Sequence, residues 1–97
     1  MVSGLMVLVG RVVEFHGHFG PFLVLGVRLG VFGLGRLGVR HGEHRLNIIV
    51  GLRRKPPYSC ILDGVQVSTG CTLGNGRLMV EESSKVYARF SLRVGIY

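Results

Sequence analysis

The chain has 97 residues, which suffices for one small domain with a poor ratio of core to surface. Hydrophobic residues make up 47% of it and the mean hydropathy is +0.43, so we expect a second subunit to cover part of its apolar surface. The net charge of +7 would suit a nucleic-acid binder, but the basic residues are scattered, with one dense cluster at Arg53, Arg54 and Lys55. This distribution argues against a nucleic-acid-binding face.

The sequence also lacks secretion and membrane signals. Two cysteines are too few for a secreted disulfide scaffold, and the apolar N-terminus has neither a basic segment nor a small-residue cleavage site. Arg28 and Arg36 interrupt the most apolar window, residues 19–38, whereas a membrane span needs about 20 predominantly apolar residues. We therefore expect a cytoplasmic protein with no membrane-spanning segment.

The first half of the chain predicts two helices. In residues 2–15 the apolar side chains follow a helical spacing, although the many valines would also suit a strand. The segment HGHFGP interrupts the pattern, and Pro21 suits the first turn of a second helix that runs to about Leu37 and ends at Gly38. Glycines inside this helix each cost about 1 kcal/mol relative to alanine, so we expect another helix or sheet to approach them closely. They are Gly26, Gly30 and Gly33.

The second half predicts strands around one short helix. Residues 44–52 form a strand, and after a proline-containing break Asp63 caps a short helix that ends at Thr69, before Gly70. A turn at residues 73–76 leads into two strands, 77–83 and 85–94, joined as a meander. The order predicts an α+β domain, with helices that include one long glycine-rich helix packed on a small antiparallel sheet.

Four side chains are candidates for chemistry, namely His16, His18, Cys60 and Cys71, with Asp63 as a helper. Imidazole and thiolate are preferred ligands of zinc and similar metals, and the glycine between the two histidines lets one loop offer two nitrogens. The spacing alone is also compatible with ordinary loop histidines and buried structural cysteines. His41 and His44 receive no role.

Two motifs resemble one protein family. The segments FHGHFGPFLVLGVRLG at 15–30 and CILDGVQVSTGCTLGNGRL at 60–78 are similar to the formylmethanofuran dehydrogenase E-subunit family, which has an HGH-x-C-P-type motif entering a helix and a later Thr-Gly-Cys-Thr-x-Gly segment. The resemblance implies that residues 1–97 form a single α+β core domain, often dimeric. It also implies a cleft in which His16, His18, Cys60 and Cys71 hold a metal, supported by Asp63 and Gln66.

The chain departs from the family pattern in two respects. Gly20 occupies the position of the family's HGH-x-C-P cysteine, so one thiol is absent. Many members continue into a cysteine-rich zinc finger, and the 97 residues contain no cysteine after Cys71. On the resemblance, the glycines and threonines around Cys71 turn the backbone so that its sulfur faces the HGH loop.

The resemblance favours a small metal-binding domain of this family, with zinc as the expected metal, that acts alone or as an accessory to a partner enzyme complex. The residue patterns leave open a metal-dependent enzyme of unknown substrate, because no general base, nucleophile and oxyanion pocket can be assigned. They also leave open a structural protein in which the glycine-faced helix forms a dimer and the cleft is degenerate. A basic nucleic-acid binder is the fourth interpretation.

Overall fold

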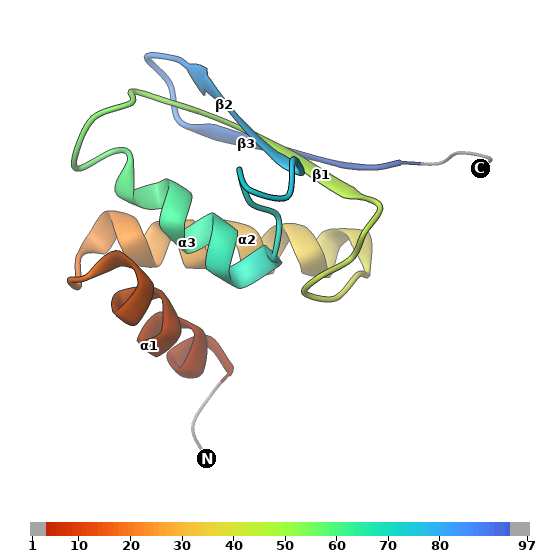
Figure 1. The fold of residues 1–97 in the computed structure, drawn as a ribbon, viewed down its shortest axis with the longest axis horizontal. Coiled ribbons are helices and arrows are strands. Elements are labelled where there is room, and N and C mark those ends of the chain that lie inside the picture. The colour runs from red at the N-terminus through yellow and green to blue at the C-terminus, as the bar shows by residue number, and fades with distance from the viewer. Residues whose placement is uncertain (1–3, 94–97) are drawn as a thin grey trace.

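Within residues 4–93 the structure contains three helices and three strands. They follow the order α1 (Gly4–His16), α2 (Pro21–Leu37), β1 (Leu46–Leu52), α3 (Cys60–Thr69), β2 (Leu78–Glu82) and β3 (Tyr87–Leu92). It is a computed structural model that describes residues 4–93, so residues 2, 3 and 94 of the predicted elements lie outside it (Figure 1). The predicted α+β class is confirmed.

Both N-terminal helices form where the sequence places them. The first segment is a helix rather than a strand, and α2 begins at Pro21. Gly38 ends α2 in the left-handed conformation, with φ of 67°, and its N–H donates to the carbonyl of Gly35 at 3.3 Å. Proline at the start and glycine just after the end are the usual asymmetry of helix boundaries.

The glycines of α2 let α3 and β3 approach it closely. A Cβ atom at Gly26 would lie 2.2 Å from the carbonyl oxygen of Ile61, and one at Gly64 would lie 2.4 Å from that of Leu23. A Cβ at Gly33 would meet the ring of Phe90 at 2.2 Å. The expected close approach is therefore confirmed, but it occurs within one chain. The idea that this glycine face forms a dimer is wrong, because α3 and β3 already cover it.

The sheet is mixed, and the predicted antiparallel meander is wrong. The strand order is β2-β1-β3, so β2 and β3 flank β1 and do not pair with each other. Strand β1 pairs in parallel with β2, where Ile48 faces Leu78, and antiparallel with β3, where Ile48 faces Phe90. Parallel neighbours require a crossover connection, and α3 supplies it between β1 and β2.

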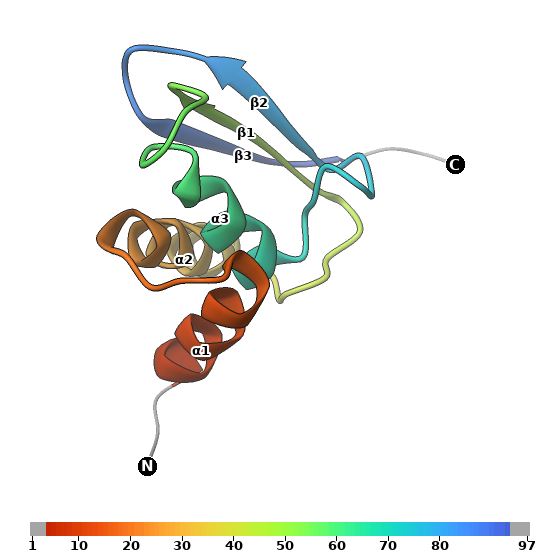
Figure 2. The ribbon, with the colours of Figure 1, turned by 60° about the vertical axis from the view of Figure 1, so that its left-hand side comes forward.

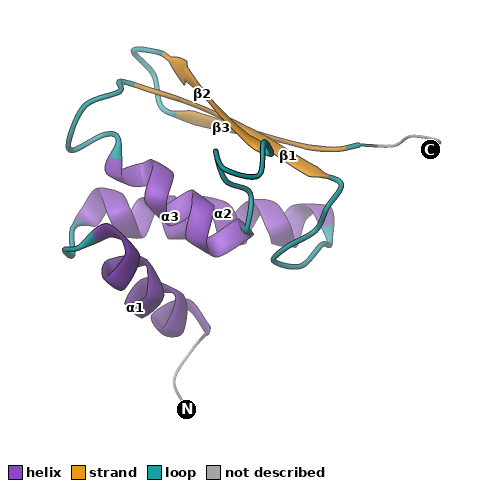
Figure 3. Ribbon diagram, in the orientation of Figure 1, coloured by secondary structure: helices purple, strands orange, loops and turns teal. Residues whose placement is uncertain are grey.

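The main core lies between the sheet and the helices, which all lie on the same side of the sheet (Figures 1 and 2). Its fully buried side chains come from β1, α3, the turn after α3 and the start of β2: Leu46, Ile48, Val50, Leu52, Ile61, Val65, Cys71 and Leu78. A smaller cluster of Val12, Leu23 and Val27 fixes α1 against α2. Helix α1 is thus the outermost layer (Figure 3).

Within residues 4–93 no helix is long and apolar enough to cross a membrane. The glycine-rich α2 has 17 residues. Leu23 and Val27 of this helix are fully buried in the protein.

Candidate metal centre

Two imidazole rings meet where α1 ends. His16 is the last residue of α1, Gly17 follows in a left-handed conformation with φ of +103°, and His18 lies in the loop before α2. The ring centroids are 4.5 Å apart and the two Nε2 atoms are separated by 3.2 Å. The HGH segment therefore presents two nitrogens to one point, as its central glycine predicts.

The other nitrogen of each ring contacts an acceptor. Nδ1 of His16 lies 2.5 Å from Oδ2 of Asp63, and Nδ1 of His18 lies 3.3 Å from the carbonyl oxygen of Phe19. A carboxylate and a carbonyl only accept, so these contacts suit the neutral tautomer in which Nδ1 carries the hydrogen, and in that tautomer each Nε2 keeps a lone pair. Two such lone pairs at 3.2 Å are satisfied by a metal ion that both nitrogens bind, or by a proton that they share in a hydrogen bond.

A cysteine sulfur completes the group. Cys60 is the first residue of α3 and is 8% exposed. The loop before it packs on α2 through an edge-to-face contact between Tyr58 and Phe22, whose ring centroids are 5.5 Å apart. One ligand atom each from His16, His18 and Cys60 lie within 4.8 Å of one another. Helix α1, the loop after it and α3 thus each contribute one donor.

The acidic helper lies beside the group. The prediction that Asp63 caps the short helix is wrong, because that helix already begins at Cys60 with Ser59 as its N-cap residue. The carboxylate of Asp63 instead points out of the first turn of α3 and receives contacts from His16 and, at 3.3 Å, from the side-chain amide of Gln66. Gln66 also accepts the N–H of Leu73 at 3.0 Å. A carboxylate that orients a ligand histidine in this way is typical of metal sites.

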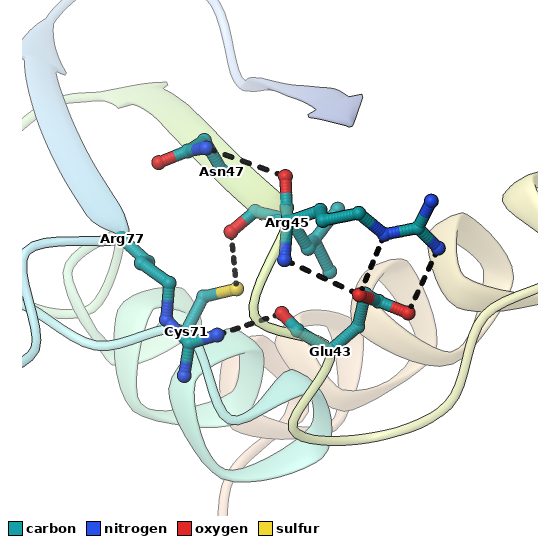
Figure 4. A network of polar contacts seen from close by, with 6 residues as sticks. Glu43, Arg45, Asn47, Cys71 and Arg77 are labelled. Atoms are coloured by element: carbon teal, nitrogen blue, oxygen red, sulfur yellow. Dashed lines mark hydrogen bonds and ion pairs between the residues drawn. The ribbon is translucent and has the colours of Figure 1, made fainter. Parts of the chain in front are cut away.

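Cys71 lies elsewhere, and its predicted convergence with the histidines is wrong. It follows the C-terminal end of α3, whereas Cys60 begins that helix, and ten residues of helix span roughly 15 Å. Its thiol donates to the carbonyl of Leu46, with Sγ 3.4 Å from the oxygen, inside the core. Figure 4 shows this bond as a dashed line from the sulfur, near the labelled Arg45 and Arg77. Burial raises the pKa of the Cys71 thiol, while Thr69 and Arg77 lower it to a smaller extent.

The glycines and threonines around Cys71 build a turn. Gly70 ends α3 with φ of 82°, and Asn75 accepts the N–H of Thr72 at 2.9 Å while its own N–H donates to the Thr72 hydroxyl at 3.0 Å. The Asn75 amide also donates to the carbonyl of Gly70 at 2.8 Å. The segment therefore reverses the chain between α3 and β2, which explains its composition without a ligand.

A hollow of about 290 Å³ borders the group. It is lined by His18, Gly20, Pro21, Phe22, Leu23, Pro57 and Cys60. A Cβ at Gly20 would meet only the ring of His18, at 3.8 and 3.9 Å, so the position is open toward the group. Sequence reasoning assigned no role to Phe22 or Pro57; two consecutive prolines shortly before a cysteine are the available signal of a shaped loop there.

The donor set fits a divalent metal. Two imidazole nitrogens and one thiol sulfur are ligands of zinc and of other borderline metals, and a zinc site with three protein ligands keeps its fourth position for water or substrate. The two histidines are held by acceptors on their outer nitrogens, which is the usual outer support of such ligands. Among residues 4–93 this is the group whose donors converge in this way.

Comparison with known proteins assigns the chain to one family. Residues 15–94 match the family described as FmdE, Molybdenum formylmethanofuran dehydrogenase operon. The chain belongs to the FmdE family. It is also 43% identical over 89 residues to a "Probable S-adenosyl-L-methionine-binding protein" of Archaeoglobus fulgidus, a match that covers 86% of this chain and 23% of that relative. The chain therefore spans under a quarter of the relative's length.

Proposed function

We propose that this FmdE domain binds one divalent metal ion, with zinc as the expected metal, through His16, His18 and Cys60. The observation that supports it is the pair of Nε2 atoms 3.2 Å apart, each belonging to a ring whose Nδ1 contacts an acceptor. That arrangement leaves two lone pairs facing one point, and Cys60 adds a third donor to the same point. Cys71 takes no part in this proposal.

Bound metal would supply a Lewis acid beside a hollow of small-molecule size. In this proposal Asp63 holds the Nδ1 hydrogen of His16, and the carbonyl of Phe19 holds that of His18, so both rings keep Nε2 toward the ion. The side chains of Phe22 and Leu23 exclude water from one wall of the hollow. An accessory role in a larger enzyme complex and a catalytic role of its own both use this arrangement.

Cobalt spectroscopy tests the ligand set. Co²⁺ bound through a thiolate gives a near-ultraviolet charge-transfer band, so the wild-type protein should show one and Cys60→Ser should lose it. Cys71→Ala is the matched control because it removes the other thiol, and its band should remain. A band that survives Cys60→Ser but vanishes in a folded Cys71→Ala protein would reverse the assignment.

S-adenosylmethionine binding is a second candidate, supported by the 43% identity to the relative whose description names that ligand. Isothermal titration of the metal-loaded chain with S-adenosylmethionine tests it. Saturable heat would support S-adenosylmethionine binding by this chain. No heat at millimolar ligand would rule it out for this chain.

We also propose a homodimer. Phe15, Phe19 and Phe32 are each more than 60% exposed, which is apolar surface that a second copy could cover. Sedimentation equilibrium gives the mass in solution, and a monomer at high micromolar concentration would dispose of the dimer.

A further inference from the structure

A basic pocket lies at the edge of the sheet where β1 and β2 both end. Its volume is about 420 Å³, and it is lined by Arg53, Arg54, Lys55, Glu82, Ser83 and Ser84. Because β1 and β2 are parallel, the loops that follow them leave the sheet side by side. In open α/β sheets, ligands bind in the crevice outside the carboxyl ends of such strands. None of the three donors of the metal centre lines this pocket.

Hydrogen bonds between the two loops hold the pocket in shape. The backbone N–H of Arg54 donates to Oε1 of Glu82 at 3.2 Å, and its guanidinium donates to the carbonyl of Val80 at 2.6 Å. The N–H of Ser83 donates to the carbonyl of Leu52 at 3.0 Å. The loops are therefore fastened to each other before any ligand arrives, which lowers the entropic cost of binding.

The remaining polar side chains of the pocket are free to meet a ligand. Within residues 4–93, the side chains of Arg53, Lys55 and Ser84 make no hydrogen bond or ion pair. Three cationic groups stand against the single carboxylate of Glu82, which already accepts the Arg54 N–H. Among the described residues that line this concave site, two positive charges are left without a compensating carboxylate.

We propose that this pocket binds the phosphate group of a small phosphomonoester. A phosphomonoester carries about two negative charges at neutral pH, which matches the two uncompensated positive charges. The guanidinium of Arg53 offers paired donors to phosphate oxygens, Lys55 adds a point charge and Ser84 a hydroxyl donor. The volume lies within the range of small-molecule sites.

A titration of the full chain followed by ¹H–¹⁵N NMR tests the proposal, with inorganic phosphate and ribose 5-phosphate as probes at fixed ionic strength. Saturable shifts are expected at the amides of residues 53–55 and 83–84. Arg53→Ser with Lys55→Ser should raise the dissociation constant of ribose 5-phosphate by about tenfold or more, since it removes two charged hydrogen-bond donors.

The matched control is Arg11→Ser with Arg40→Ser, which removes the same charge from exposed positions outside the pocket. It should change the dissociation constant by less than about twofold, because exposed distant charges are screened by salt. Equal weakening in both double variants would show general charge attraction and overturn the proposal. The proposal would also be overturned if ribose 5-phosphate produced no saturable shifts at these amides, whatever the effect of inorganic phosphate. Shifts produced by a single-stranded oligonucleotide but not by ribose 5-phosphate would overturn it as well.

Discussion

At the scale of single residues, the outer partners of the two histidines decide what the site can do. Asp63 and the carbonyl of Phe19 each accept from an Nδ1, so the Nε2 atoms of His16 and His18 face one another as donors to a cation. The carboxylate of Asp63 is itself held by Gln66. The positioning of His16 therefore also depends on Gln66, which lies about one turn beyond Asp63 in α3.

Replacing Asp63 with asparagine should weaken metal affinity by about 10–100-fold, because His16 loses the charged acceptor that fixes its ring. Competition with a chromophoric chelator measures the change. Glu14→Gln is the control, since it removes an exposed carboxylate from α1 two residues before His16. Equal losses in both variants would show that overall charge, and not the Asp63 contact, sets the affinity.

The two cysteines should differ in reactivity. Iodoacetamide should modify Cys60 once a chelator has removed the metal, whereas Cys71 should stay unmodified in the folded protein because it is 1% exposed and its thiol pKa is raised by burial. Peptide mass spectrometry assigns the modified thiol. Rapid alkylation of Cys71 in the folded chain would contradict its place in the core.

The same raised pKa predicts how stability depends on pH. The folded state keeps the Cys71 thiol protonated to higher pH than the unfolded chain does, so this contribution is complete below the usual thiol pKa and is lost as pH rises through the raised value. Wild-type protein should therefore lose more unfolding free energy above the usual thiol pKa than Cys71→Ala does. Urea unfolding at a series of pH values measures both free energies. The same pH dependence of the unfolding free energy in the two proteins would contradict this prediction.

At the scale of elements, the contact between α2 and α3 sets the position of the site. Gly26 and Gly64 bring the two backbones together, with hypothetical Cβ distances of 2.2 and 2.4 Å to opposite carbonyl oxygens. This contact fixes the start of α3, and with it Cys60 and Asp63, against the loop that enters α2.

Gly64→Ala should destabilise the protein by about 1–3 kcal/mol, because its methyl group meets the backbone of α2 and cannot be relieved by moving a side chain. Urea unfolding measures the loss. Gly35→Ala in α2 is the control: its Cβ would meet nothing within 4 Å, so helix propensity should stabilise the protein by up to about 1 kcal/mol. An unchanged free energy of unfolding in Gly64→Ala would contradict the close contact between the two backbones.

The sequence predicts the elements better than their pairing. Pro21, Gly38 and Gly70 act locally on φ and on hydrogen bonding, so the helix boundaries they mark can be predicted. The pairing of β1 with β2 depends on the crossover through α3. A strand, a helix and a strand in succession do indicate parallel pairing, and the interpretation as a meander overlooked this pattern.

The site was predictable to the same extent. The glycine between His16 and His18 brings two nearby rings together, which is a local effect. The position of Cys71 relative to them depends on the direction in which α3 runs, and no local pattern reports that direction. The glycines and threonines around Cys71 are equally compatible with a thiol that binds a ligand and with a buried thiol beside a tight turn, and the structure shows the second.

At the scale of the whole molecule, a bound metal would join the outermost helix to the rest. Helix α1 is otherwise held by the cluster of Val12, Leu23 and Val27, against which Val67 of α3 packs, and by the contact of His16 with Asp63. It provides His16 to the site. Cys60 comes from α3, which packs directly on the core of the sheet. Metal binding would therefore add a further link between α1, whose one buried residue is Val12, and α3, which packs on the sheet.

Removal of the metal should loosen α1 first. Hydrogen exchange measured with and without chelator should show faster exchange in the second half of α1 and little change in β1, whose inward side chains are fully buried. Uniform acceleration in all elements would indicate that the metal stabilises the fold globally and not through α1.

The most direct measurement is the metal content of the wild-type chain purified without a histidine tag and analysed by inductively coupled plasma mass spectrometry. We expect one equivalent of zinc or a similar divalent metal per chain, retained in Cys71→Ala and lost when His16 and His18 are both replaced with alanine. A folded wild-type protein that binds no metal after exposure to stoichiometric zinc, or one whose metal is unaffected by loss of both histidines, would contradict this expectation.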